Sequence, residues 1–303
     1  MHKIKDIVDL EQHKNKAWYK QKYRIQDKEI LDYQCYKYLD KEMRGPKPNL
    51  GSSYFACLGA AQTFGRYCEK PFPNLLSNKL GVDVLNWSNG GAGPLHFLQK
   101  PEILEAVNNA RFAIVQVLSA RSGTSNSVYE SLGLANVIRR NDQKKMRSEM
   151  VFRELVNGQD PRGKEKGFIA DLIEETRENY VFNMIQLLEQ IKVPKILFWF
   201  SVRSPLYKDI DVENLAIGDD VANNDLTPLF NDFPQMVNQE MVDVIKLKSN
   251  LYVECISSEG LPHDLIDFQG KKVGVNNYYP SPEMHEEAAA ELLPLCQQLL
   301  ATN

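Results

Sequence analysis

The chain has 303 residues, of which 43% are hydrophobic and 25% are charged, the composition of an ordinary globular protein. Its formal net charge of −4 argues against non-specific binding to nucleic acid. No apolar run reaches the roughly 20 residues of a membrane-spanning helix, and residues 1–16 lack the apolar core of a secretory signal. Five scattered cysteines without a CxxC pair argue against a disulfide framework or a metal site. We therefore expect a cytoplasmic protein without a metal, while its cofactors and oligomeric state stay open.

The N-terminal part, residues 1–50, is polar with interleaved aromatic residues such as Trp18 and Tyr33. We predict one or two helices here, forming an extension that covers the main domain. Gly45-Pro46-Lys47-Pro48 is a turn-rich connection into that domain, which we expect to span residues 51–303.

The stretch from Tyr54 to Leu98 organises the rest of the chain. An apolar run at Tyr54–Leu58 predicts a buried strand, followed by a turn of small residues. A helix is predicted from the prolines near Pro71 to Leu80, and Gly81 is placed to end it. A second strand at Val82–Trp87 completes a βαβ unit. Such units place their loops at the carboxyl edge of a parallel sheet, where open α/β folds bind ligands.

Three more apolar runs predict strands, and they alternate with helical patterns. These strands are Phe112–Leu118, Lys195–Phe200 and Leu251–Ile256. Helices are predicted before, between and after these strands, at Lys100–Asn109, Phe168–Ile191, Pro234–Leu247 and Ala288–Leu300. This order predicts an α/β fold, a three-layer αβα sandwich around a mostly parallel five-stranded sheet.

Residues 123–165 form a long irregular connection, which we interpret as an insertion and a candidate lid. Its basic residues between Arg139 and Arg147 predict the exposed face of a helix, with an anion site as the alternative. The acidic stretch from Leu206 to Pro228 is predicted to loop over the edge of the site.

The turn after the first strand resembles the first motif of the SGNH/GDSL hydrolases, G-D-S-x-T. Gly59 and Thr63 match its ends, but Ala60 and Ala61 replace its Asp and its nucleophilic Ser. The variant turn G-N-C-Q, from a capsule-biosynthesis branch of SGNH-like proteins, aligns with residues 59–62 and places Gln62 in its last position. The resemblance implies an SGNH-like, flavodoxin-like fold without the serine nucleophile.

The loop after the second strand resembles the next motif of the same family, N-x-G-x-x-G. Asn86 and Gly91 match its ends, and Ser88 replaces its first glycine. The resemblance implies that the backbone amide of Gly91 is an oxyanion donor.

The C-terminal motif of the family, D-x-x-H, aligns with residues 282–285. His285 takes the position of the general base, while Pro282 stands in place of the orienting Asp. Glu283 is the nearest substitute for that carboxylate.

Arginine side chains follow three of the predicted strands or their turns. Arg66 follows the first turn, Arg121 ends the third strand at the position of the family's Asn, and Arg203 ends the fourth. Arginine forks, backbone amides and helix N-termini bind carboxylate, sulfate or phosphate. We therefore predict an anion site at the carboxyl edge; the alternative is that each arginine pairs with a local carboxylate. The remaining candidate binding residues are Gln62, Thr63 and Gly90.

Three functions stay open. The first is a divergent SGNH-like transferase or hydrolase that acts on a carbohydrate, in cell-surface polysaccharide metabolism. The second is a sulfotransferase-like enzyme with a phosphosulfate nucleotide donor, since the first turn, Arg121 and Ser127 loosely resemble its phosphate-binding segments. The third is a non-catalytic ligand-binding protein. In each case we expect a small-molecule or carbohydrate partner that carries negative charge.

Overall fold

A computed structural model describes residues 30–39, 41–206 and 230–302. The helices predicted before residue 30, and the predicted 206–228 loop beyond its first residue, lie outside these ranges. The side chain of Ser122 is likewise not described.

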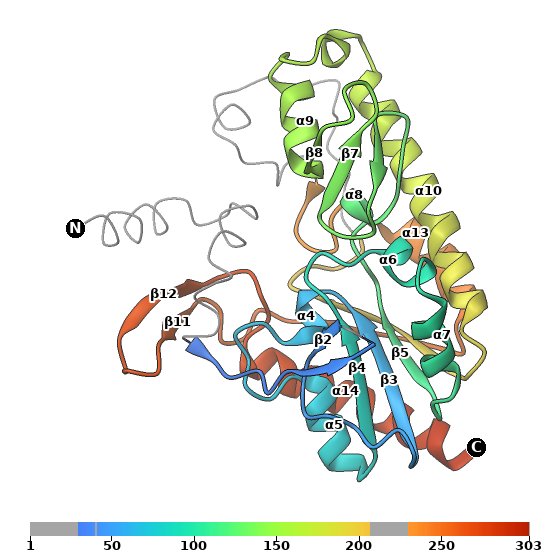
Figure 1. Ribbon diagram of the computed structural model, residues 1–303, viewed down its shortest axis with the longest axis vertical. Helices are drawn as coiled ribbons and strands as arrows, with labels where there is room; N and C mark the ends of the chain where they lie inside the picture. The colour runs from blue at the N-terminus through green and yellow to red at the C-terminus, as the bar shows by residue number, and fades with distance from the viewer. Residues whose placement is uncertain (1–29, 40, 207–229, 303) are drawn as a thin grey trace.

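The centre of the molecule is a five-stranded sheet in which every neighbouring pair is parallel (Figure 1). The order across the sheet is β10-β9-β5-β3-β4. The strands are β3 (Tyr54–Gly59), β4 (Asp83–Ser88), β5 (Ala113–Gln116), β9 (Lys195–Ser201) and β10 (Leu251–Ile256). The five strands predicted from the sequence and the α/β fold class are confirmed.

Helices cover both faces of this sheet and make the three layers. On one face α5 (Phe72–Leu80) and α14 (Pro282–Thr302) bury alternate strand residues such as Phe55 and Phe198. The opposite face packs against α7 (Pro101–Asn108), α10 (Phe168–Gln190) and α13 (Gln239–Ile245). Because both faces are covered, the strands are continuous apolar runs, as expected for a parallel sheet.

The short helices α4 (Ala61–Phe64), α6 (Pro94–Leu98) and α8 (Ala120–Gly123) follow three of these strands directly. They leave the sheet at the carboxyl ends of β3, β4 and β5. They therefore form the floor on which a ligand of an open α/β sheet would rest.

Residues between β5 and α10 form a second small unit above this edge. It contains the antiparallel strands β6 (Tyr129–Ser131), β7 (Asn136–Arg139) and β8 (Lys145–Arg147), followed by α9 (Ser148–Val156) and the 3-10 helix η1 (Pro161–Lys164). We call residues 124–164 the upper unit. Figure 1 shows it at one end of the molecule, beside the upper half of α10.

Two segments differ from the predicted secondary structure. The described part of the N-terminal extension forms a ribbon of β1 (Tyr36–Tyr38) and β2 (Lys41–Met43), where we expected helix. Tyr36 and Tyr38 alternate with exposed Lys37, and the Tyr38 ring meets the edge of Trp87, so the period is that of a strand. The basic residues of the upper unit lie on the β7–β8 hairpin instead of a helix. There Arg139 pairs with Asp142 and Glu154.

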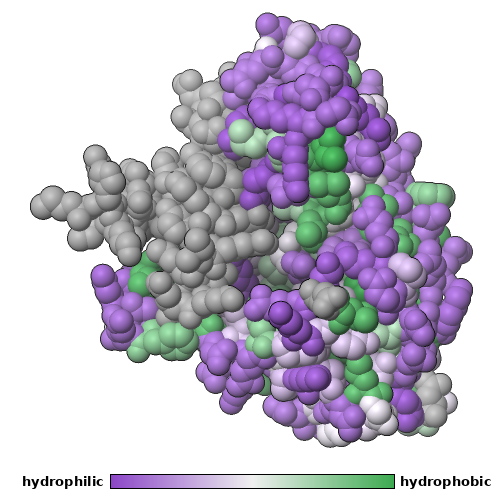
Figure 2. All heavy atoms as spheres, in the orientation of Figure 1, coloured by the Kyte–Doolittle hydropathy of each residue, from purple (hydrophilic) through white to green (hydrophobic). Residues whose placement is uncertain are grey.

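The remaining elements lie at the periphery. The 3-10 helix η3 (Lys246–Lys248) precedes β10, and β11 (His263–Ile266) pairs with β12 (Lys272–Asn276) as an isolated hairpin. Hydrophilic residues cover most of the face seen in Figure 2, and apolar residues lie on it in separate groups. Of the described helices, none combines the length and apolar character that crossing a bilayer requires.

Candidate functional site

The strand order reverses its direction at β3, which lies between β4 and β5. At such a switch point the loops after the two central strands diverge and leave a crevice at the carboxyl edge. The turn after β3 and helix α8 after β5 lie at this edge of the sheet.

Gln116, the last residue of β5, lies at the carboxyl edge of the sheet and binds the turn after β3. Its Oε1 accepts hydrogen bonds from the Ala60 backbone N–H at 2.9 Å and from Thr63 Oγ1 at 2.8 Å. Gln116 is fully buried, and its Nε2 has no hydrogen-bond partner in the described part of the chain. The sequence analysis missed this residue; its signal is a single polar side chain in an apolar strand. Thr63 is therefore engaged in holding the turn.

No nucleophilic side chain occupies the serine position of the first motif. Ala61 begins α4 and is buried, as are Gln62 and Thr63. Burial raises the pKa of the nearby Cys57 thiol well above its ordinary value, so this cysteine is not an activated nucleophile. Gln62 instead lines a small cavity of about 30 Å³ together with Ser201 and Tyr278. That volume holds one or two water molecules.

His285 lies under the first turn, at the start of α14, and is completely buried. Its ring packs against Phe72 and Phe200, with centroids 6.1 and 5.3 Å away. Burial, and to a smaller extent the charge of Arg44, lowers the pKa of His285 to about 3, so the ring is neutral near pH 7.

The tautomer of His285 differs from that of a general base. Its Nδ1 accepts a hydrogen bond from the Phe72 backbone N–H at 3.2 Å, so the proton of the neutral ring is on Nε2. In this tautomer Nε2 carries a proton that it can donate, and it has no lone pair to take one. Nε2 is buried and has no partner among the residues described.

Glu283 does not orient His285. Its side chain is exposed, and a Cβ added to Gly260 would lie 2.1 Å from its Oε2, which places this carboxylate beside Gly260. The interpretation of Glu283 as the substitute orienting carboxylate is therefore wrong, because the Phe72 amide occupies the Nδ1 side of the ring.

Arg121 lies in a buried cluster of charges at the carboxyl edge. Its Nη1 is 2.8 Å from Oε2 of Glu149, the second residue of α9, and Arg147 Nε is 3.0 Å from the other oxygen of the same carboxylate. Tyr129 fixes α8 from the other side, because its hydroxyl donates to the Arg121 carbonyl at 2.6 Å. The upper unit thus supplies the carboxylate that forms an ion pair with the buried Arg121.

Arg66 reaches the same region through Tyr279. Its Nη1 donates to the Tyr279 hydroxyl at 2.8 Å, and its guanidinium stacks on the rings of Tyr67 and Tyr279. Burial lowers the pKa of Arg147, and the charges of Glu149 and Arg121 also act on it, so these three groups are neighbours. We call Arg66, Arg121, Arg147, Glu149 and Tyr279 the arginine cluster.

Arg203 serves a different purpose from the other two predicted arginines. It stacks on Trp199 at 5.0 Å, and its guanidinium donates to the backbone carbonyls of Asp232, Pro234 and Val237. Gln235 in the same loop donates to the Tyr278 hydroxyl at 2.7 Å. Arg203 therefore holds the loop of residues 232–237, in which Gln235 binds Tyr278.

The second motif lies against the upper unit. Gly91 has a φ of +77°, and a Cβ there would lie 2.9 Å from the Cβ of Ala135, between β6 and β7. Asn86 donates to the Thr63 carbonyl at 3.3 Å and accepts from Ser88 at 2.5 Å. The loop that carries Gly90 and Gly91 is thus held by both neighbouring segments, and the oxyanion role of Gly91 stays a prediction.

The segments that resemble a sulfotransferase are already engaged within the chain. The Ala60 amide of the first turn is bound by Gln116, Arg121 pairs with Glu149, and Ser127 donates to Glu175 at 2.6 Å. Among the described residues no three His, Cys, Asp or Glu side chains lie close enough to hold a metal ion.

A domain of unknown function, DUF6473, matches residues 21–155, which is less than half of the chain. No curated protein matches the sequence.

Several solved structures resemble the chain at low identity. The lipase Lip_vut3 from a goat rumen metagenome is 12% identical over 80% of this chain and 96% of its own, with a TM-score of 0.38. The acetyl xylan esterase Est2A from Butyrivibrio proteoclasticus is 13% identical over 88% of this chain and 68% of its own, with a TM-score of 0.42. The acetylxylan esterase Axe2 from Geobacillus stearothermophilus is 11% identical over 80% and 93%, with a TM-score of 0.38.

Proposed function

We propose that this chain is a divergent SGNH-like enzyme that transfers or hydrolyses an acyl or other group on an anionic carbohydrate, in cell-surface polysaccharide metabolism. The arginine cluster binds the anionic part of the substrate at the edge where the resembled family carries its serine nucleophile. With Ala61 in the serine position, the attacking oxygen comes from water or from an acceptor hydroxyl, and no covalent enzyme intermediate forms.

One observation carries the proposal: several buried polar atoms at the carboxyl edge make no hydrogen bond with the described residues. In the part of the chain that the structure describes, Arg121 Nε, Ser119 Oγ and Ser148 Oγ have no hydrogen-bond partner. Ser119 precedes α8, and Ser148 adjoins Glu149, the carboxylate bound to Arg121. Buried polar groups are almost always satisfied, so such a group of donors favours a ligand with oxygen acceptors.

The chemistry assigned to His285 follows from its tautomer. A neutral ring with its proton on Nε2 acts as a hydrogen-bond donor to a developing negative charge, and does not remove a proton. We assign His285 this donor role, and the proton of the attacking oxygen passes to the oxygen of the leaving group as its bond to the transferred group breaks.

The test is a thermal-shift screen followed by calorimetry. Coenzyme A, acidic and acetylated oligosaccharides and uncharged sugars are screened first, with adenosine 3′,5′-bisphosphate as the probe for a sulfotransferase. We expect an anionic carbohydrate or acyl donor to raise the melting temperature, and the nucleotide to leave it unchanged. A shift with the nucleotide alone contradicts the proposal.

Arg66→Gln is the informative variant, because it leaves Arg121 paired with Glu149. A charge-assisted hydrogen bond is worth about 1.5–3 kcal/mol, so we expect its loss to weaken binding about 10- to 100-fold. Arg66→Lys should restore only part of the affinity, since a point charge does not replace the fork. Arg140→Gln, an exposed arginine that donates to the Asn126 carbonyl, is the control and should bind like the wild type. If the wild type and the three variants all bind the ligand with equal affinity, the arginine cluster has a structural role only.

A non-catalytic binding protein is the second candidate, and one observation favours it. Ala61 and the tautomer of His285 together remove both the nucleophile and the base of the resembled family. Incubating the best thermal-shift ligand with the protein and measuring free acyl groups or free sugar separates the two. Turnover supports the enzyme; a stabilised protein with no product, in the presence of candidate acceptors, supports the binding protein.

A further inference from the structure

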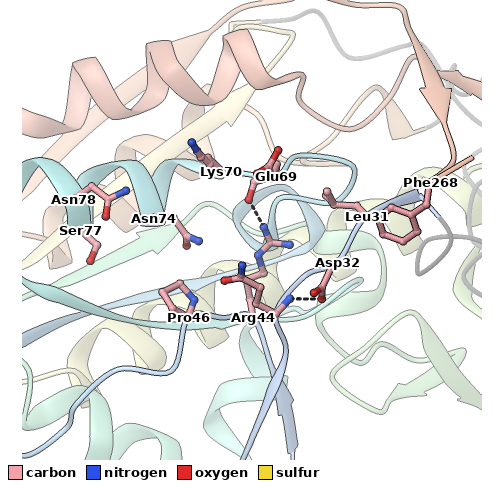
Figure 3. Close-up of a pocket in the computed structure, with 11 residues that line it drawn as sticks. Leu31, Asp32, Arg44, Pro46, Glu69, Lys70, Asn74, Ser77, Asn78 and Phe268 are labelled. Atoms are coloured by element: carbon pink, nitrogen blue, oxygen red, sulfur yellow. Dashed lines mark hydrogen bonds between the residues drawn. The ribbon is translucent and has the colours of Figure 1, made fainter. Parts of the chain in front are cut away.

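A separate pocket lies on the flank of α5, between that helix and the segment around β2. Its volume is about 480 Å³, within the ~300–1,000 Å³ typical of small-ligand sites. Figure 3 shows the residues used below, Arg44, Lys70, Asn74, Ser77 and Phe268, around this space. We call it the Arg44 pocket; it contains no member of the arginine cluster.

Arg44 makes the pocket unusual, because its buried charge forms no ion pair with any described residue, although the exposed carboxylates of Asp32 and Glu69 also line the pocket. The residue is 2% exposed and stacks on Tyr33 at 4.8 Å. Its Nη2 donates to the backbone carbonyls of Cys68 and Glu69, at 3.1 and 2.6 Å. Nε and Nη1 have no hydrogen-bond partner in the described residues, nor does any carboxylate there form an ion pair with Arg44.

An unpaired buried charge is costly, and burial lowers the pKa of Arg44. The cation has two carbonyl contacts, yet two of its nitrogens have no acceptor among the described residues. Arginine binds carboxylate and phosphate oxygens more strongly than any neutral acceptor. An anion entering the pocket would complete the hydrogen bonding of the guanidinium and neutralise its charge.

The remaining wall suits a sugar. Asn74 donates to the Gly45 carbonyl at 3.0 Å and keeps a buried Oδ1 without a partner among the described residues. Ser77 lies one turn further along the same helix, and the exposed ring of Phe268 offers an apolar face. The exposed part of the wall carries the positive Lys70 and the negative Asp32 and Glu69, so the buried Arg44 is the group that would bind the anion. Amide and hydroxyl groups match sugar hydroxyls, and an aromatic ring matches the apolar side of a pyranose.

We propose that the Arg44 pocket binds a sugar of one or two rings that carries a carboxylate or a phosphate, with its oxyanion on Arg44. The site contains no residue of the arginine cluster. It would hold an acidic carbohydrate whether or not the carboxyl edge performs chemistry.

Calorimetry with defined probes tests this assignment. The probes are glucuronate for a carboxylate, glucose 6-phosphate for a phosphate, glucose for the uncharged ring, and inorganic phosphate for the anion alone. We expect one of the two acidic sugars to bind, and glucose to bind at least about 10-fold more weakly, the value of one charge-assisted contact. Inorganic phosphate binding as tightly as either acidic sugar would overturn the assignment to a sugar.

Two variants locate the binding and one controls for the loss of an arginine. Arg44→Gln removes the charge, and Ser77→Trp fills the pocket from the half-buried side of α5 while keeping Arg44. Each variant should bind the acidic sugar about 10- to 100-fold more weakly than the wild type. Arg111→Gln, a partly buried arginine that donates to the Leu300 carbonyl, should bind within about twofold of the wild type, since contacts this far from a site contribute little.

The melting temperature separates this site from a structural arginine. If Arg44 is present for a ligand, Arg44→Gln melts no lower than the wild type without ligand, because an uncompensated charge has been removed. The proposal is overturned if both Arg44→Gln and Ser77→Trp bind the acidic sugar as tightly as the wild type does. It is also overturned if the wild type binds none of the probes at 10 mM, a concentration that corresponds to a binding free energy of about −2.7 kcal/mol. If Arg44→Gln does not fold, Ser77→Trp alone decides it.

Discussion

Single buried residues determine what the candidate site can do, and His285 is the clearest case. Its folded pKa of about 3 lies below the ~6.5 of an unfolded chain, so between these values the unfolded state binds more protons. Stability is therefore fully present above pH 6.5 and is lost as the pH falls toward 3. His96 has its pKa lowered to about 3 as well, chiefly by burial, and acts in the same direction.

We predict that the wild type loses stability between pH 7 and pH 5, and that His285→Gln loses less. One pKa step is worth about 1.4 kcal/mol, so the contribution of His285 at pH 5 is about 2 kcal/mol. Gln keeps an acceptor for the Phe72 amide and does not titrate. Urea unfolding at the two pH values measures the difference, and identical losses in both proteins would mean that His285 is not the neutral buried group described.

Removing the carboxylate of Glu149 should strongly destabilise the folded protein. It faces Arg121 and Arg147 and is 3% exposed. Glu149→Gln leaves a buried guanidinium without its charge partner, and we expect a loss of about 3–5 kcal/mol of unfolding free energy. Glu154→Gln, which removes a more exposed partner of Arg139, should cost about 1 kcal/mol or less. Denaturation curves that show equal losses for the two variants would contradict the burial argument.

At the scale of elements, the close approach of α6 and α8 holds the floor of the site together. Gly93 precedes α6, and a Cβ there would lie 2.0 Å from the backbone Cα of Gly123 in α8. The two short helices therefore meet through glycines, and α8 also carries Arg121. A side chain at this contact would shift the arginine together with its helix.

Gly93→Ala should lower stability by about 1–3 kcal/mol, the usual cost of overpacking a tight contact, and weaken anion binding at the arginine cluster. Gly51→Ala is the control, because Gly51 lies in an exposed turn where an added Cβ meets only Asn49 Oδ1 at 3.3 Å. Thermal melting and calorimetry report the two effects separately. A Gly93→Ala protein that melts and binds like Gly51→Ala would show that the helices separate easily.

For the molecule as a whole, stability should decrease from the central sheet toward the peripheral hairpins. Strands β3, β5 and β9 lie between two helical layers, whereas β11 and β12 form a hairpin of two strands with exposed side chains. An isolated hairpin has little buried apolar surface, and such regions open at low free energy.

Hydrogen exchange should therefore protect the amides of β3, β5 and β9 longest, and those of β11 and β12 least. Mass spectrometry of peptides across the chain measures this order directly. Fast exchange in β5 would mean that the buried Gln116 weakens the centre of the sheet and that the core lies elsewhere.

The sequence by itself determined the elements of this protein, because local pattern encodes them. The runs Lys195–Phe200 and Leu251–Ile256 are apolar enough to be strands in any α/β fold, and Pro71 and Gly81 mark the ends of α5. The absence of a serine at position 61 was equally visible. The β1–β2 ribbon was not, since its short strands resemble a helical pattern in composition.

Only the tertiary structure decided what the predicted site residues do. The Phe72 amide, which sets the tautomer of His285, is 213 positions away, and the Arg121–Glu149 pair joins residues 28 positions apart. Charge pairing and hydrogen bonding depend on which groups meet after folding, and no local pattern encodes that meeting. Gln116 and Arg44 follow the same rule: the sequence shows only that each is polar, and its role depends on the groups that other segments place around it.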